Sequence, residues 1–116
     1  MYAIQGAIFE VYSEMICGFL ESVYQECLES ELQRRGIPFE SQQALTLHYK
    51  GEQLKQTFKP DLICYGKIII ELKAVKDLEK EHEAQVFNYL KVSSYRLGLL
   101  VNFGHYPKVK VKRIIL

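Results

Sequence analysis

The chain has 116 residues, a length typical of one domain and too short for two. Because 48% of its residues are hydrophobic and 25% are charged, the composition excludes disordered and fibrous proteins. Fifteen Lys and Arg residues nearly balance fourteen Asp and Glu residues, and the formal charge of +1 excludes a strong overall positive field. We expect one domain over residues 1–116, in which any surface for nucleic acid is a local patch.

The cysteines and the apolar segments indicate a compartment. Cys17, Cys27 and Cys64 are odd in number and show no CxxC spacing, so neither a disulfide framework nor a zinc site is predicted. No apolar run approaches the roughly 18 to 20 residues that span a bilayer, and the first 15 residues contain Glu10 and Glu14 rather than the basic n-region and the cleavage site of a signal peptide. We expect a cytoplasmic protein that is neither secreted nor bound to a membrane.

Hydrophobic periodicity predicts three helices and five strands. Apolar residues recur at i, i+3 and i+4 spacing in the predicted helices, and the second of these ends at the stop signal Arg35-Gly36. The predicted helices cover 3–15, 20–35 and 78–93, and the predicted strands cover 44–49, 54–64, 67–75, 95–102 and 109–116. The order ααβββαββ predicts a mixed α/β fold around one sheet.

The segment 59–73 predicts a β-hairpin that turns at Gly66. Antiparallel pairing about this glycine places Asp61 directly opposite Glu71. Because side chains alternate along a strand, the two carboxylates share a face, and the opposite face is wholly apolar. The first face holds Asp61, Ile63, Ile69, Glu71 and Lys73, and the second holds Leu62, Cys64, Ile68, Ile70 and Leu72.

The two facing carboxylates predict a metal site. At about 5 Å between Cβ atoms they repel each other, and a divalent cation between them relieves the repulsion. Such oxygen ligands suit Mg²⁺ or Mn²⁺, and Lys73 beside the ion is placed to hold an attacking water or to stabilise charge on a phosphate. Two alternatives stay open: a Glu-Leu-Lys triplet is common on solvated sheets, and a one-residue slip would turn Asp61 to the other face.

Polar residues on the flanking helices and on the last strand have two interpretations each. Glu21 either complements the helix dipole or enters the metal site directly or through water, whereas we expect Tyr24 in the core. Gln85 and Tyr89 share a helical face. Either both point toward the site, or Gln85 is a surface residue and Tyr89 a core residue. The stripe Lys108, Lys110 and Lys112 protects an edge strand from aggregation or contacts phosphates.

Four motifs occur along nearly the whole chain: Gly18-x-x-Glu21-x-x-Tyr24, Pro60-Asp61, Glu71-Leu72-Lys73-Ala74, and His82-Glu83-Ala84-Gln85 with Tyr89. In this order they resemble the motifs of the GxxExxY protein family, a small branch of the PD-(D/E)xK nuclease superfamily. The resemblance implies a restriction-endonuclease-like αβββαβ core, a mixed central sheet flanked by helices, which here follows one extra N-terminal helix.

The resemblance also implies roles for individual residues. Asp61 and Glu71 would be metal ligands, Lys73 the catalytic lysine and Glu21 the acidic residue that the helix contributes. The backbone carbonyl of Leu72 would be a further ligand. Gln85 and Tyr89 match the glutamine and tyrosine that follow the lysine motif in one nuclease branch.

The predicted function is Mg²⁺- or Mn²⁺-dependent hydrolysis of phosphodiester bonds, with DNA as the expected substrate. The alternative is a catalytically inactive module that binds nucleic acid or a protein and retains the nuclease fold. A homodimer is plausible, because a domain of this size offers little surface to a duplex and each subunit would then cut one strand.

Overall fold

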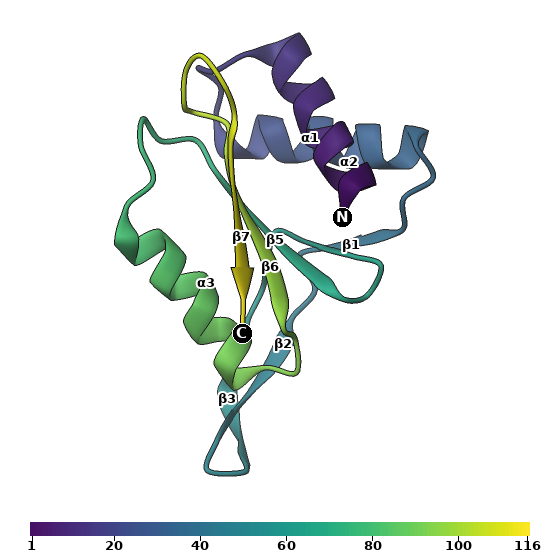
Figure 1. The fold of residues 1–116 in the computed structure, drawn as a ribbon. Coiled ribbons are helices and arrows are strands. Elements are labelled where there is room, and N and C mark those ends of the chain that lie inside the picture. Colours follow the sequence, from purple (N-terminus) through teal and green to yellow (C-terminus); the bar gives the residue numbers. More distant parts are fainter.

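The computed structural model describes residues 1–116, which form three helices and seven strands in two sheets (Figure 1). None of the helices has the length and apolar character needed to cross a membrane. The elements are α1 Tyr2–Met15, α2 Glu21–Arg34, β1 Phe39–Ser41, β2 Leu45–Tyr49, β3 Glu52–Phe58, β4 Leu62–Cys64, β5 Ile68–Lys73, α3 Lys80–Val92, β6 Leu97–Asn102 and β7 Lys110–Ile115.

The main sheet has five strands in the order β1-β4-β5-β6-β7. Strands β5 and β6 are parallel and every other pair is antiparallel, so the sheet is mixed, as predicted. Helices α1 and α2 cover one face and α3 covers the other (Figure 1). The parallel pair needs a crossover connection, and α3 supplies it between β5 and β6.

The larger core lies between the sheet and the α1–α2 pair. The helical periodicity of the sequence places Ile4, Ile8 and Val11 of α1 toward the sheet, where all three are buried. Tyr24 of α2 is fully buried and stacks on Phe103, with 4.6 Å between ring centroids, which confirms the expected core position. A smaller cluster lies beneath α3 and contains Ile63, Ile69, Val86, Leu90, Leu100 and Ile114.

The predicted register of the hairpin is correct. Leu62 pairs with Ile70 and Cys64 pairs with Ile68, which is the pairing centred on Gly66. Tyr65 and Gly66 both have positive φ, at 56° and 64°, as a tight hairpin turn requires. The predicted apolar face lies against α1 and α2, so the face with Glu71 and Lys73 lies on the α3 side.

The single strand predicted over 54–64 is wrong. The chain breaks at Lys59-Pro60-Asp61, and β3 and β4 on either side of the break belong to different sheets. Proline cannot donate a ladder hydrogen bond, which explains why the strand ends there. A short strand that the sequence analysis missed, β1, occupies the edge of the main sheet and pairs with β4.

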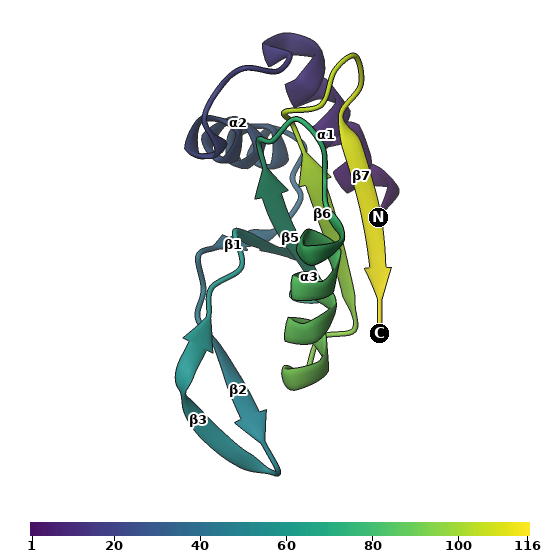
Figure 2. The same cartoon turned by 90° about the vertical axis from the view of Figure 1, so that its left-hand side faces the viewer.

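The observed order is therefore ααβββββαββ rather than ααβββαββ. Leaving out the β2–β3 hairpin, the elements α2-β1-β4-β5-α3-β6 form the αβββαβ core that was predicted, preceded by α1 and followed by β7. The β2–β3 hairpin forms its own two-stranded sheet and projects beyond the rest of the molecule (Figure 2). We call this hairpin, residues 45–58, the arm.

Candidate functional site

Asp61 and Glu71 lie side by side where the pairing of β4 with β5 ends. Asp61 is one residue before β4, and its carboxylate Oδ2 accepts a hydrogen bond from the Leu72 N–H at 2.7 Å. The Asp61 N–H in turn donates to Oε1 of Glu71 at 3.3 Å. Both side chains are only partly exposed. The hairpin thus brings together two carboxylates without a basic partner between them.

Two glutamines that the sequence analysis missed hold Asp61 in place. Gln25 of α2 donates from Nε2 to the Asp61 carbonyl at 2.9 Å, and the Gln42 N–H donates to the same carbonyl at 3.3 Å. The Gln42 side-chain amide lies 3.2 Å from Oε1 of Gln25 and 3.4 Å from Oδ1 of Asp61. The available signal was the spacing of Gln25, which follows Glu21 by one helical turn.

Burial and mutual repulsion make the carboxylates hard to ionise. Burial chiefly, together with the negative charges of Asp61 and Glu21, raises the pKa of Glu71 from 4.5 to about 8. Burial also raises the pKa of Asp61, although the Leu72 N–H, the Gln42 amide and Lys73 act in the opposite direction. The pair therefore has unfavourable negative charge that a cation would stabilise.

Lys73 and Glu21 lie within electrostatic reach of this pair. Strand alternation puts Lys73 on the same face of β5 as Glu71, and its positive charge lowers the pKa of both carboxyl groups. Glu21 is the exposed first residue of α2, on the helical face that Gln25 directs toward Asp61. Its negative charge raises the pKa of Glu71, and because Glu21 is itself exposed, it lies at the margin of the site.

The residues fit a cation that takes few protein ligands. No group of three or more His, Cys, Asp or Glu side chains gathers closely enough to hold a metal ion. Mg²⁺ is commonly held by one or two carboxylates and keeps several waters, which suits Asp61 and Glu71. The N–H and C=O of one strand residue point to the same side, so the Leu72 carbonyl faces the side on which Asp61 lies.

Gln85 is exposed and Tyr89 is half-buried on α3, and neither has a hydrogen bond to the two carboxylates. They line an open hollow of about 530 Å³ together with neighbouring residues of the same helix. Tyr89 stacks on Phe58 at the base of the arm, with 3.8 Å between parallel rings. His82, which was assigned no role, accepts a hydrogen bond from the Glu79 N–H and caps α3.

Two lysines of the predicted stripe, Lys110 and Lys112, are aligned with site residues across β6. Strand pairing aligns Lys73 with Asn102 and Asn102 with Lys110, and likewise aligns Glu71 with Leu100 and Leu100 with Lys112. The stripe therefore continues the rows of side chains that begin at Lys73 and Glu71. Lys112 also lies 3.8 Å from Glu83 of α3, and Lys108 precedes the strand.

Asn102 is the one polar or charged residue whose side chain is fully buried, and the sequence analysis missed it. Its Oδ1 accepts hydrogen bonds from the N–H groups of Val75 and Gly104, both at 3.0 Å, and Nδ2 has no partner. A Cβ on Gly104 would clash with the Val75 carbonyl oxygen, so only glycine fits. Asn102 thereby connects the segment that follows β5 with the segment that follows β6. The first of these contacts, at Val75, is two residues beyond Lys73.

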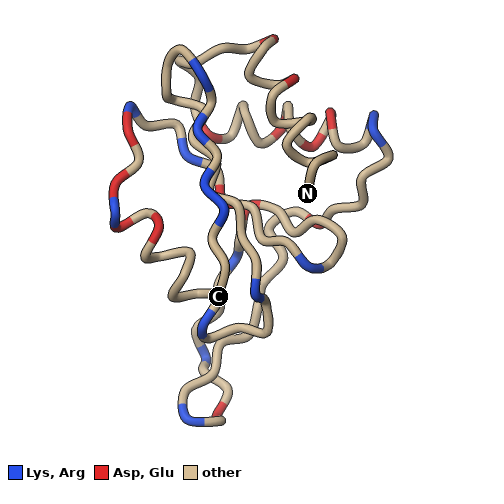
Figure 3. Tube along the Cα trace, in the orientation of Figure 1, with Lys and Arg blue, Asp and Glu red and all other residues tan.

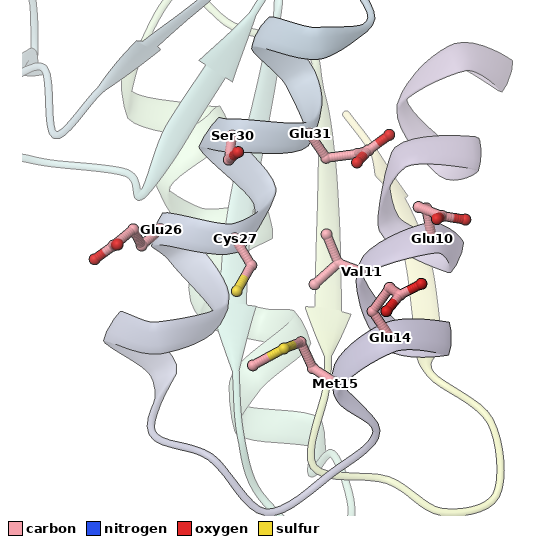
Figure 4. A pocket seen from close by; sticks show the side chains of 8 residues that line it. All are labelled: Glu10, Val11, Glu14, Met15, Glu26, Cys27, Ser30 and Glu31. Carbon is pink, nitrogen blue, oxygen red and sulfur yellow. The ribbon is translucent and has the colours of Figure 1, made fainter.

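Charge is separated along the chain. Residues 1–33 contain six acidic residues and no Lys or Arg, whereas all fifteen basic residues and eight acidic ones follow (Figure 3). A hollow of about 290 Å³ between α1 and α2 illustrates the acidic side, with Glu10, Glu14, Glu26 and Glu31 in its lining (Figure 4). This α1–α2 face repels a phosphate backbone, so an approaching nucleic acid meets the remainder of the surface.

Comparisons with known proteins agree with the fold. The family model of the PD-(D/E)XK nuclease superfamily matches residues 1–114. No curated protein matches the chain. The crystal structure of SSO0001 aligns with a TM-score of 0.62 and 22% sequence identity over 81% of this chain and 48% of that one, so this chain spans about half of that protein. The likeness supports a restriction-endonuclease-like fold, and the family match shows that the chain belongs to the PD-(D/E)XK nuclease superfamily.

Proposed function

We propose that the protein is a divalent-metal-dependent nuclease that hydrolyses phosphodiester bonds of DNA. The observation that carries the proposal is the pair of half-buried carboxylates, Asp61 and Glu71, with Lys73 as their nearby cation. Residues 1–116 would act as one nuclease-like domain of the cytoplasm. The resemblance of the four motifs supports a place for the chain, within its superfamily, in the GxxExxY branch.

The metal site would be built from few ligands. Asp61, Glu71 and the Leu72 carbonyl would bind Mg²⁺ or Mn²⁺, and Glu21 at the margin would bind through a water. When bound, the cation supplies a Lewis acid that favours ionisation of a water and neutralises charge on the phosphate. Gln25 and Gln42 keep Asp61 oriented and thereby reduce the reorganisation that binding requires.

The other residues would act on the attacking water and the DNA backbone. Lys73 would donate hydrogen bonds to the water and to the scissile phosphate, where negative charge develops. Lys110 and Lys112 continue the rows of Lys73 and Glu71, and with Lys108 they would neutralise neighbouring phosphates. Gln85 and Tyr89 would contact the backbone from the hollow on α3.

One chain holds one such site, so cutting both strands of a duplex at one position would need two copies. We therefore propose that the protein acts on DNA as a homodimer. Sedimentation velocity with and without duplex DNA tests this point, because the proposal requires a species of twice the monomer mass in at least one of the two conditions.

The test of the activity is a cleavage assay on linear, nicked and branched DNA with and without Mg²⁺ or Mn²⁺. Asp61→Asn, Glu71→Gln and Lys73→Met should each reduce cleavage by a factor of about 100 or more. The matched controls are Glu10→Gln on α1 and Lys67→Met in the turn before β5, two exposed residues outside the site at which the same charges are altered. Cutting that survives in all three site variants would refute the proposal.

Metal binding is measured in parallel by calorimetric titration of the wild type and Asp61→Asn. The proposal expects binding that Asp61→Asn abolishes. A folded protein that binds DNA but neither binds metal nor cuts would instead be a non-catalytic binding module that retains the nuclease fold.

A further inference from the structure

The arm is not needed to complete the nuclease core. Strand β1 pairs directly with β4, so the main sheet is continuous without β2 and β3. Most of the arm is exposed, including all residues from Glu52 to Thr57 of β3. A two-stranded hairpin is marginally stable by itself, so this arm must be supported by the body of the protein.

That support is concentrated at the base of the arm. Leu45 is buried in the cluster beneath α3, and Phe58, its partner across the ladder, stacks on Tyr89 of α3. Only Lys59 and Pro60 separate Phe58 from Asp61. The position of the arm is therefore coupled over a short length of chain to the candidate metal ligand.

The two faces of the arm differ in chemistry. Along β2, Leu45 and Leu47 are buried, whereas Thr46 and His48 are exposed. Burial therefore alternates along this strand, although its pairing with β3 is irregular. Residues directly opposite each other share a face, and Thr46 lies opposite Thr57 while His48 lies opposite Gln53. The outward face therefore presents Thr46, His48, Gln53 and Thr57, and Lys55 is exposed on the irregular stretch of β3 between Gln53 and Thr57.

With Lys55 beside it, this face has hydrogen-bonding side chains, one fixed positive charge and no acidic residue. The turn of the arm adds Lys50, whose ammonium lies 5.5 Å from the ring centroid of Tyr49, and Tyr49 itself is 63% exposed. Glu52, opposite Tyr49, is the only acidic residue between 45 and 58. The arm thus complements a polyanion, in contrast to the acidic α1–α2 face.

We propose that the arm is a two-stranded ribbon that enters the major groove of double-stranded DNA and holds the duplex against the site at Asp61. The inference rests on the proposed function, because it assigns the form of the nucleic-acid substrate. Thr46, His48, Gln53 and Thr57 face the base edges, and Lys50 and Lys55 neutralise phosphates at the rims of the groove.

The dimensions of the arm agree with this assignment. Strand β2, the shorter of the two, has five residues, which at about 3.3 Å each give a paired ribbon roughly 17 Å long. Its two strands lie about 5 Å apart, and the major groove of B-form DNA, about 12 Å wide, admits a two-stranded ribbon. The major groove of an RNA duplex is too narrow and deep for side chains to read, so the arm discriminates DNA from RNA.

The test compares two double variants. The arm variant carries Lys50→Ala and Lys55→Ala, and the control variant carries Arg34→Ala and Lys67→Ala. Both double variants lose two exposed positive charges, but Arg34 and Lys67 lie outside the arm. Every protein carries Glu71→Gln and is kept in EDTA, so that binding is measured without cleavage. Fluorescence anisotropy gives the affinity for a DNA duplex and an RNA duplex of one sequence at several salt concentrations.

The arm variant should bind the DNA duplex about tenfold more weakly, with the slope of log K against log salt reduced by roughly two. The control should retain the affinity and slope of the parent, and the affinity for RNA should be the same in the arm variant and the parent. The proposal is overturned if the arm variant binds DNA like the parent, if the control or RNA binding falls equally, or if the parent binds no duplex DNA.

This outcome is separable from the test of nuclease activity. Metal-dependent cutting by the wild type with arm-independent DNA binding would overturn the role of the arm and leave the nuclease proposal intact. Arm-dependent duplex binding by a protein that never cuts would overturn the nuclease proposal and leave the role of the arm intact.

Discussion

The Leu72 N–H donates to the Asp61 carboxylate at 2.7 Å, just beyond the last paired residues of β4 and β5. That last pair is Leu62 with Ile70, so the carboxylate accepts the hydrogen bond that a longer β4 would have accepted with its backbone. Asp61 therefore has a structural role as the cap of a strand pair in addition to its proposed role as a metal ligand.

Two substitutions at Asp61 should separate these roles. Asp61→Asn keeps an oxygen acceptor for Leu72 and removes the repulsion with Glu71, so the metal-free protein should be as stable as the wild type or more stable. Asp61→Ala leaves the N–H without its acceptor and should cost about 1–3 kcal/mol. Urea denaturation in EDTA measures both, and equal destabilisation by the two substitutions would contradict the capping role.

The stability of the metal-free protein should fall as the pH rises from about 4.5 to about 8. Folding raises the pKa of Glu71 from 4.5 to about 8, so the folded protein retains a proton that the unfolded chain releases in this range. The stabilisation is complete below pH 4.5 and is lost as the pH passes through the folded pKa. A tenfold change in the proton affinity of Glu71 corresponds to about 1.4 kcal/mol, which alone lowers the melting temperature by roughly 4 °C.

Thermal melts of the wild type and Glu71→Gln across this range isolate the effect, because the glutamine cannot titrate. The difference between their melting temperatures should grow toward alkaline pH. A constant difference would contradict the raised pKa.

Metal binding should release a proton near neutral pH. A carboxylate must be ionised to bind a cation, and Glu71 with a pKa of about 8 is largely protonated at pH 7. Calorimetric titration with Mn²⁺ in buffers of different ionisation enthalpy should therefore give release of roughly one proton at pH 7 and much less at pH 9. Binding without proton release at pH 7 would show that Glu71 is not a ligand.

The amide of Asn102 should stabilise the segments behind the site. Asn102→Ala leaves the N–H groups of Val75 and Gly104 without their acceptor, which should cost roughly 2–4 kcal/mol. Asn102→Asp retains an acceptor and should restore part of this loss. Denaturation of both variants tests the point, and it would fail if alanine and aspartate destabilised equally.

Local patterns in the sequence were sufficient to predict the hairpin of the site. One glycine gave the register, and alternation gave the two faces, because both features depend only on neighbouring residues. The helices α1, α2 and α3 followed from periodicity in the same way. The αβββαβ core came from the resemblance of the motifs to a known family, and it is observed.

The remaining features depend on contacts between distant segments. Strand β1 has only three residues and exists because β4 pairs with it, so its own sequence carries no clear signal. Gln25 and Gln42 meet Asp61 across 36 and 19 residues of sequence, and Asn102 meets Val75 across 27. Uncharged amides are frequent in any chain, and only the folded arrangement reveals which of them support a site.

The first 33 residues, which form α1 and nearly all of α2, carry six acidic and no basic residues, so the charge of the molecule is unevenly distributed although its net charge is only +1. The field of a polyanion orients a molecule whose charge is unevenly distributed. The protein should therefore approach DNA with α1 and α2 facing away from it and with the β7 lysines and the arm facing toward it. Association rates with DNA should consequently fall steeply as added salt screens this electrostatic orientation beyond distances of about 10 Å.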